Sequence, residues 1–201
     1  MRSLKDGTTR PYRLKARAEK QTETHRALAR AAFELHDTVG PSRTTVSAIA
    51  ERAGVQRLTV YRHFPSDEAI FSACTAYAFE LDPPPNPEAW IAIADPMQRL
   101  RTALSELFGY YGRRRQLLAN LYRDAEMPVV AAALARRRAI LQRAVEILLA
   151  AWSADDGTQR SLSATIGHAL EYSTWLSLTV EQGLDDDEAI ALSARWVAAI
   201  V

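Results

Sequence analysis

Apolar residues in the first third of the chain recur at helical spacing. Leu28, Ala31, Ala32 and Leu35 follow the i, i+3, i+4, i+7 pattern that places side chains on one face of an α-helix. We therefore expect a helix from about residue 19 to about Thr38, where a Gly-Pro-Ser sequence soon follows and ends it.

The stretch from Thr44 to Phe64 has the pattern of two short helices joined by a tight turn. Gly54 stands where the chain must leave the first helix, and glycine adopts positive φ without a Cβ clash. The second helix is expected from Gln56 to His63, because the residue before a proline disfavours the α conformation. The apolar positions of one small core would be Ile49, Ala50, Ala53, Val55 and Val60. This spacing is that of a helix-turn-helix, with an ordinary helical hairpin as the alternative.

The positions of cap residues, prolines and glycines predict helices over most of the remaining chain. Ser66 is a good N-cap and two acids follow it, so a helix should begin there and reach about Leu81. Residues 82–87 are rich in proline and should be extended. Later helix boundaries are expected at Pro96, Gly112, Pro128 and Trp152.

Two apolar helices are expected at the end of the chain, over about residues 158–182 and 186–201. Asp185 and Glu188 have the spacing of a capping box at the start of the last helix. That helix is apolar on more than one face, so it needs partners on two sides. Two such helix pairs from two subunits would form a four-helix bundle, so we expect a homodimer. Burial inside a monomer is the alternative.

Charge is distributed unevenly along the chain. Residues 1–64 hold 13 Lys and Arg against 6 Asp and Glu, whereas residues 65–201 hold 12 against 18. A basic surface on a helix-turn-helix is typical of proteins that bind nucleic-acid phosphates. The acidic remainder would be repelled by DNA, so we expect it to point away from the duplex.

Several other classes of protein are not indicated. The single cysteine, Cys74, excludes an intramolecular disulfide and a multi-cysteine zinc site. The sequence has neither an apolar run of about 18 residues nor a hydrophobic signal core, so we expect no membrane association and a cytoplasmic protein. The common nucleotide-binding, hydrolase and zinc-protease motifs are missing and the histidines are scattered, so we expect no enzyme, no cofactor and no metal.

The segment from about Ala18 to Phe71 resembles the tetracycline-repressor (TetR) family of bacterial regulators. The residues that carry the resemblance are Leu28, Ala31, Ala32, Phe33, Leu35, Gly40, Thr44, Thr45, Ile49, Ala50, Ala53, Gly54, Val55, the run Thr59 to Phe64, and Glu68. Three positions depart from the family pattern: His36 replaces the usual aromatic, Leu58 a Gly or Ala, and Asp67 a phosphate-binding Lys. The resemblance implies an all-α fold, with an N-terminal three-helix helix-turn-helix head and a C-terminal helical bundle.

The residues of the motif suggest separate roles in DNA binding. Arg57 suits the O6 and N7 atoms of guanine and Gln56 suits adenine, while Leu58 is expected to alter which base edge is read. Thr45 should cap its helix, and residues near the end of the second helix should hold phosphate or sugar. The full set of expected DNA contacts is Thr44, Thr45, Gln56, Arg57, Leu58, Thr59, Tyr61, Arg62 and His63. Each could instead be a solvated or helix-bracing side chain.

The resemblance also implies a repressor that leaves a pseudo-palindromic operator when a small molecule binds between the middle helices. The candidate effector-binding residues are Phe108, Tyr111, Tyr122, Trp152, His168, Glu171, Tyr172 and Trp175. Aromatic residues at helical spacing belong more often to a core than to a pocket, and the sequence does not identify the effector.

The expected organisation has three parts. Residues 1–18 form a basic flexible tail or a DNA-contacting arm, residues 19–65 a helix-turn-helix domain, and residues 66–201 an effector-binding and dimerisation domain. A helical adaptor that binds protein without binding DNA is the alternative function, but it leaves the uneven charge unexplained.

Overall fold

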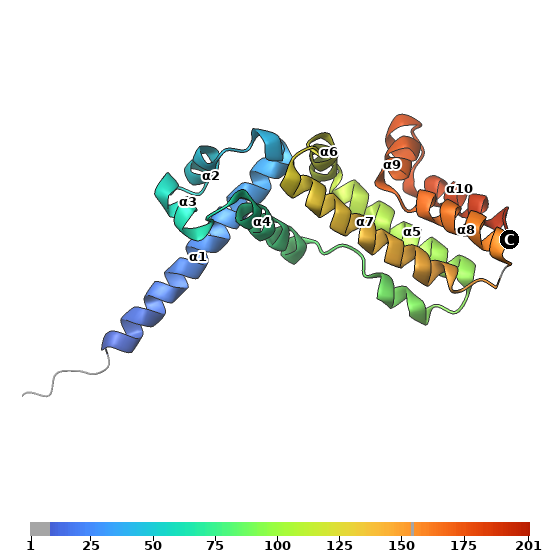
Figure 1. Cartoon of the computed structure of the whole chain (residues 1–201), viewed down its shortest axis with the longest axis horizontal. Coiled ribbons are helices and arrows are strands. Elements are labelled where there is room, and N and C mark those ends of the chain that lie inside the picture. The colour runs from blue at the N-terminus through green and yellow to red at the C-terminus, as the bar shows by residue number, and fades with distance from the viewer. Residues whose placement is uncertain (1–8, 154) are drawn as a thin grey trace, which may run out of the picture. The chain divides into compact units, whose positions relative to one another are not determined.

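The computed structural model describes residues 9–153 and 155–201, with side chains from Leu14 onward. All regular structure in these ranges is helical and they contain no strand, so the predicted all-α fold is confirmed. Figure 1 shows the helices, labelled α1 to α10. The chain divides into two compact units, of which the first ends at Asp82 and the second begins at Pro83.

The first unit is a small helical head held by one hydrophobic core. Its elements are α1 (Thr9–Thr38), the 3₁₀ turn η1 (Pro41–Arg43), α2 (Val46–Arg52), α3 (Arg57–His63) and α4 (Asp67–Leu81). The expected stripe of α1 is buried, and Leu28 is fully enclosed. It packs in one cluster with Ile49 of α2, Val60 of α3, and Ile70 and Cys74 of α4. Burial of these apolar side chains fixes the position of the short α3.

The first helix begins well before its apolar stripe. It starts at Thr9 rather than near residue 19, and the side chains from Leu14 to Glu23 are exposed. Local bonds support these turns, including one of 3.1 Å from the Thr22 hydroxyl to the Ala18 carbonyl. Residues 9–18 of the predicted tail are therefore helical, and residues 1–8 lie outside the described residues. A DNA contact by this segment stays a prediction.

The sequence assigned residues 66–201 to one effector-binding and dimerisation domain. In the structure, however, α4 packs with α1 in the first unit. Packing therefore divides the chain after Asp82, whereas the functional division after residue 65 stays a prediction.

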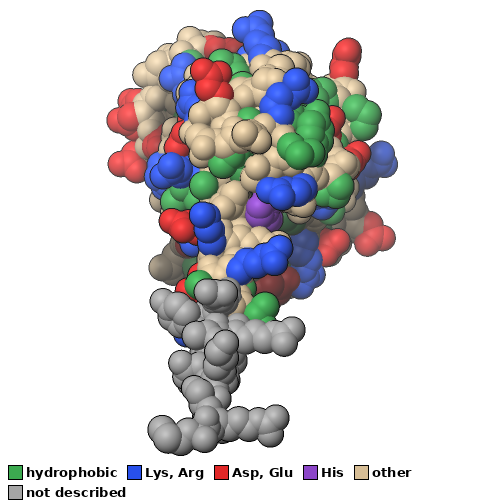
Figure 2. Space-filling model, turned by 90° about the vertical axis from the view of Figure 1, so that its left-hand side faces the viewer, with side chains coloured by type: hydrophobic (Ala, Val, Ile, Leu, Met, Phe, Trp, Pro, Cys, Tyr) green, Lys and Arg blue, Asp and Glu red, His purple; other side chains and the backbone are tan. Residues whose placement is uncertain are grey.

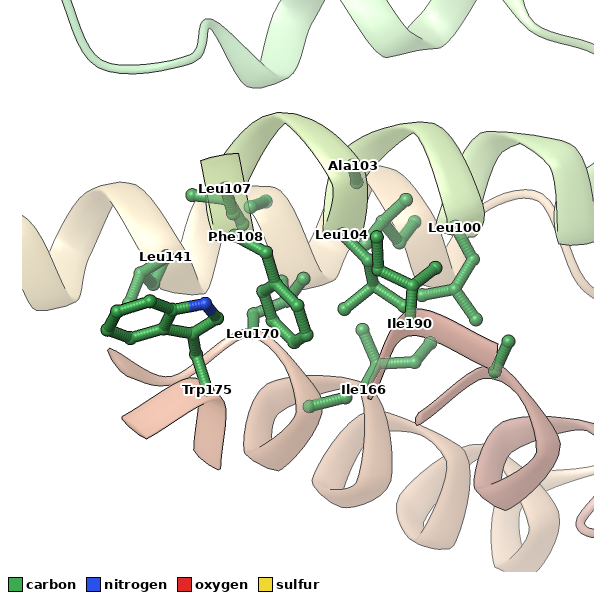
Figure 3. Packing of buried hydrophobic residues seen from close by; sticks show 14 of the residues in the cluster. Leu100, Ala103, Leu104, Leu107, Phe108, Leu141, Ile166, Leu170, Trp175 and Ile190 are labelled. Atoms are coloured by element: carbon green, nitrogen blue, oxygen red, sulfur yellow. The ribbon is translucent and has the colours of Figure 1, made fainter. Parts of the chain in front are cut away.

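The second unit is a larger bundle. Its elements are η2 (Pro87–Ala92), α5 (Pro96–Arg113), α6 (Arg115–Arg123), α7 (Pro128–Leu149), α8 (Asp156–Ala169), α9 (Tyr172–Trp175), the π-helical segment η3 (Leu176–Glu181) and α10 (Asp186–Ala198). Figure 3 shows Leu104 and Phe108 of α5 pointing toward Ile166 of α8 and Ile190 of α10. The first three of these side chains are fully buried, so α5 lies at the centre of the core.

Several predicted helix starts are confirmed by their capping bonds. The Ser66 hydroxyl oxygen accepts the Ala69 N–H at 3.3 Å, and the carboxylate of Asp95, before Pro96, accepts the Gln98 N–H at 2.6 Å. Asp185 and Glu188 form the expected reciprocal capping box. These bonds satisfy N–H groups that have no partner inside the helix.

The continuous helix expected over residues 158–182 is wrong. The α8 helix ends at Ala169 and α9 begins at Tyr172. The Thr174 hydroxyl donates to the His168 carbonyl at 2.6 Å, and the Tyr111 hydroxyl donates to the Leu170 carbonyl at 2.7 Å. These side chains take carbonyl oxygens that a continuing helix would bond to its own N–H groups, so they stabilise the break.

Candidate functional site

The turn between α2 and α3 sets the direction of the second helix. Thr45 caps α2 as predicted, because its side-chain oxygen accepts the Ala48 N–H at 3.1 Å. At the other end Gly54 has a φ of 67°, and the Val55 N–H donates to the Ala50 carbonyl at 2.9 Å. A left-handed residue followed by such a bond is the Schellman motif, which ends α2 and redirects the chain.

Along α3 one side chain is buried and most of the others are exposed. Val60 is fully enclosed in the core of the head, which anchors the helix from beneath. Gln56, Arg57, Leu58, Tyr61 and Arg62 are exposed, while Thr59 and His63 are half-buried. The helix therefore presents two cations and several hydrogen-bonding groups on its outer side. This arrangement can bind a polyanion with α3 lying in a groove.

Thr44 and Thr45, both predicted to contact DNA, already make different hydrogen bonds within the head. The Thr44 hydroxyl donates to the Gly40 carbonyl at 2.8 Å, so its hydrogen is already used within the head. Thr45 uses its oxygen as an acceptor, so its hydroxyl hydrogen can still be donated to another oxygen. Of the two, Thr45 has the better hydroxyl for a phosphate oxygen.

A histidine from α1 lies against the end of α3. The ring centroids of His25 and His63 are 6.0 Å apart, and His25 meets the buried Phe64 edge to face at 4.8 Å. Figure 2 views the molecule from the left-hand side of Figure 1 and shows Lys and Arg side chains next to a His side chain. The pKa of His63 is lowered by partial burial first, and then by the neighbouring His25 and Arg62. The sequence did not point to His25, because 38 positions separate it from His63 and only the tertiary fold joins them.

Four of the predicted effector-binding residues meet in one aromatic cluster, formed by Tyr111, Tyr122, Tyr172 and Trp175. Tyr122 and Tyr172 are stacked with centroids 5.3 Å apart, and Tyr111 meets Tyr172 and Trp175 at 5.7 and 6.1 Å. Phe108 lies next to Tyr111 at 6.4 Å. The cluster joins α5, α6 and α9, which are separate in the sequence.

Tyr111, Tyr172 and Trp175 of this aromatic cluster use their polar atoms in hydrogen bonds within the protein. Besides the bond of Tyr111 to Leu170, the Tyr172 hydroxyl donates to the Arg115 carbonyl at 3.2 Å. The Trp175 indole N–H donates to the Asp186 carboxylate at 3.0 Å. The cluster is thus held in place from both α6 and α10.

Charged groups surround the same aromatic rings. The Arg137 guanidinium carbon lies 5.1 Å from the centroid of the Tyr111 ring, a cation–π contact that the sequence did not predict. Burial raises the pKa of Tyr111 and Tyr122, while the charge of Arg137 acts in the opposite direction and that of Glu171 raises both. Both phenols are therefore neutral hydrogen-bonding groups at physiological pH.

The two remaining candidates, His168 and Trp152, have their contacts elsewhere. The His168 ring lies 6.0 Å from the Trp196 ring, and Trp152 is half-buried against the hydrophobic core of the second unit. Their role in effector binding stays a prediction.

Comparison with known proteins identifies the first unit. Residues 28–74 match the family model described as bacterial regulatory proteins, tetR family. A comparison with curated proteins finds no match.

Solved structures share the fold. A TetR-like transcriptional regulator from Rhodococcus sp. RHA1 is similar with a TM-score of 0.59 and 20% identity, over 87% of this chain and 93% of that one. NalD, the secondary repressor of the MexAB-OprM multidrug efflux pump in Pseudomonas aeruginosa, gives 0.58 and 22%, over 90% and 95%. A putative transcriptional regulator from Saccharomonospora viridis, in complex with choline, gives 0.59 and 17%, over 88% and 96%. At these identities the likeness shows the fold alone.

The first unit has the helix-turn-helix of bacterial regulatory proteins, and the second unit is a separate helical bundle. The match of residues 28–74 shows that the first unit contains a helix-turn-helix domain of the tetR family of bacterial regulatory proteins. The solved structures show that the rest of the chain shares the fold of TetR-like regulators.

Proposed function

We propose that this chain is a sequence-specific DNA-binding repressor that a small-molecule effector releases from a pseudo-palindromic operator. The observation that carries the proposal is the outer side of α3, which exposes Gln56, Arg57 and Arg62 around the buried anchor Val60. A short helix anchored in this way can enter the major groove of a duplex. Such a regulator would act in the cytoplasm. In the described residues, no helix is both long and apolar enough to cross a bilayer.

The two arginines of α3 are proposed to have different roles in DNA binding: Arg57 contacts a base and Arg62 contacts a phosphate. Arg57 is in the first turn, near the base edges, whereas Arg62 is in the last turn, where phosphate contacts are expected. Arg57→Ala is expected to cost about 1–3 kcal/mol at one base position of the operator. Arg62→Ala should weaken binding to all DNA sequences alike. It should also make the slope of log K against log salt concentration shallower by roughly 1, because one phosphate contact is lost.

Binding to the operator and to random duplexes over a range of salt concentrations distinguishes these roles. The operator is first selected from random-sequence DNA with the wild-type protein. The matched control is Arg101→Ala, which removes an exposed arginine from α5 of the second unit rather than from α3. If both α3 variants affected cognate and random DNA equally, the division of roles would be wrong. No DNA binding even at low salt would favour the protein-binding adaptor.

We also propose that α8 and α10 form the dimer interface, within the segments 158–182 and 186–201. One face of each helix is buried inside the unit, by residues such as Ile166 and Val197. Leu192 and Trp196 are only half-buried, so α10 keeps apolar surface that a second subunit would cover. A two-fold dimer would carry two α3 helices to successive major grooves, about 34–36 Å apart.

Trp196→Asp is expected to prevent dimerisation, because a carboxylate would be buried in the apolar interface. Operator affinity should fall by about 100-fold or more, since the second half-site contact is no longer intramolecular. Sedimentation equilibrium and operator titration measure the two effects. Ile140→Asp is the control, because it adds the same acid at an exposed apolar position of α7. If Trp196→Asp protein remained dimeric, the dimer interface would not include this face of α10.

The effector is proposed to bind at the aromatic cluster. This proposal is supported by the convergence of Tyr111, Tyr122, Tyr172 and Trp175 from three helices, beside the charged groups of Arg137 and Glu171. Aromatic faces with a few charged groups suit an organic molecule that has both apolar and polar parts. Release from DNA requires that this molecule bind the DNA-free state more tightly than the DNA-bound state.

A further inference from the structure

The contact between His25 and His63 joins two titratable rings from different helices. The rings are 6.0 Å apart, and the buried Phe64 lies beside both of them, at 4.8 Å from His25 and 6.4 Å from His63. Phe64 is fixed in the core of the head, so it holds the two imidazoles near each other. His63 is the last residue of α3, and His25 belongs to the neighbouring α1.

The charged groups that act on His63 are cations. They are His25 from α1 and Arg62 from α3 itself. Two acids of α4 have other partners: Glu68 bonds to Ser66, and Glu80 pairs with Arg26 of α1 at 3.0 Å. Asp67 is exposed at the start of α4. In the free protein, a proton on His63 is therefore opposed by partial desolvation and by like charge.

A DNA phosphate would reverse this balance. It would supply a negative charge beside the two imidazoles and stabilise the protonated form of His63. We propose that DNA binding is coupled to proton uptake by the His25–His63 pair, so that His25 of α1 is a proton-linked positioning residue outside the two motif helices, α2 and α3. This inference rests on the proposed function, because it needs α3 to lie against a duplex.

The sign of the pH dependence follows from the two states. The free protein has a His63 pKa below its ordinary value of 6.5, and the phosphate-bound state would have a higher one. Between these two values the complex holds a proton that the free protein lacks, so affinity should rise as the pH falls. Below the lower value both states are protonated, and above the higher value neither is, so the affinity should level off at both ends. The total change should be roughly tenfold for each unit of pKa difference.

Calorimetry of DNA binding in buffers of different ionisation enthalpy counts the protons directly. The probe is a mixed-sequence duplex of about 30 base pairs, long enough for two half-sites one turn apart, at fixed low salt. Wild-type protein is expected to take up protons at a pH near 6.5. A parallel NMR titration of the His25 and His63 rings, with and without the duplex, assigns the protons to these residues.

Variants separate the pair from other sources of pH dependence. His63→Gln should abolish the uptake. His25→Gln should reduce it and shift the affinity change to higher pH, because it removes the like charge that lowers the pKa of His63 in the free protein. His25→Arg keeps a permanent charge beside His63, so it should shift the change to lower pH. Thr22→Gln is the matched control on exposed α1 and should behave as wild type.

The possible outcomes distinguish this inference from the function on which it rests. DNA binding without proton uptake, or uptake that both His→Gln variants leave unchanged, would overturn the proton coupling and leave the regulator intact. No binding to the duplex at any pH would overturn both. Opposite shifts in the His25→Gln and His25→Arg variants would support the coupling.

Discussion

Val60→Asp is expected to unfold the head and abolish DNA binding. Val60 is fully buried between α1, α2 and α4, and a carboxylate there has no cation in the hydrophobic cluster around it. Burying an unpaired charge costs several kcal/mol, comparable to the stability of about 5 kcal/mol of a small domain. Circular dichroism should show the loss of helix, and a mobility-shift assay should show the loss of the DNA complex.

The second unit provides an internal check on this result. All four tryptophans, at positions 90, 152, 175 and 196, belong to it. Tryptophan fluorescence should therefore keep its native spectrum in Val60→Asp protein. Leu58→Asp adds the same acid to the exposed face of α3, where Leu58 is 67% exposed, and should leave the head folded. Native helix content in Val60→Asp protein would contradict the packing described for α3.

Phe108→Ala is expected to lower the free energy of unfolding of the second unit by about 3–5 kcal/mol. Phe108 is fully buried at the centre of the core, so the smaller side chain would leave a cavity among the helices around it (Figure 3). Urea denaturation followed by tryptophan fluorescence measures the change. The midpoint should fall while the slope stays the same, because the substitution changes stability rather than the surface exposed on unfolding.

Ile140→Ala is the control for this experiment. Ile140 belongs to the same unit but is 45% exposed, so its truncation should change stability by only about 0.5 kcal/mol. If Phe108→Ala had an equally small effect, Phe108 would be a better candidate for the wall of an open pocket than for the core.

The sequence predicted the head closely because its signals are local. The N-cap of Thr45, the positive φ of Gly54 and the helix ending at His63 depend on residues within a few positions of one another. The apolar pattern predicts a start of α1 near residue 19, whereas the helix begins at Thr9. The difference arises because the first turns of α1 lack apolar periodicity. Helix formation there is supported by local propensity and side-chain bonds instead.

The candidate sites were harder to predict because they depend on distant residues. Helical spacing made Tyr111 and Trp175 candidates, but it could not place Arg137 over the Tyr111 ring. The same spacing could not distinguish Phe108 in a core from Phe108 in a pocket wall. The break after α8 depends on the hydroxyl of Tyr111, which is 59 positions away from Leu170.

The buried position of Cys74 has a chemical consequence. The Cys74 sulfur lies 3.2 Å from Nδ1 of the buried His36. Burial raises the pKa of the Cys74 thiol to about 12, so the nucleophilic thiolate is scarce despite the nearby imidazole. Peroxides and alkylating agents would reach this sulfur only after α4 separates from α1, so the intact head should tolerate oxidative stress without a change in its regulatory state.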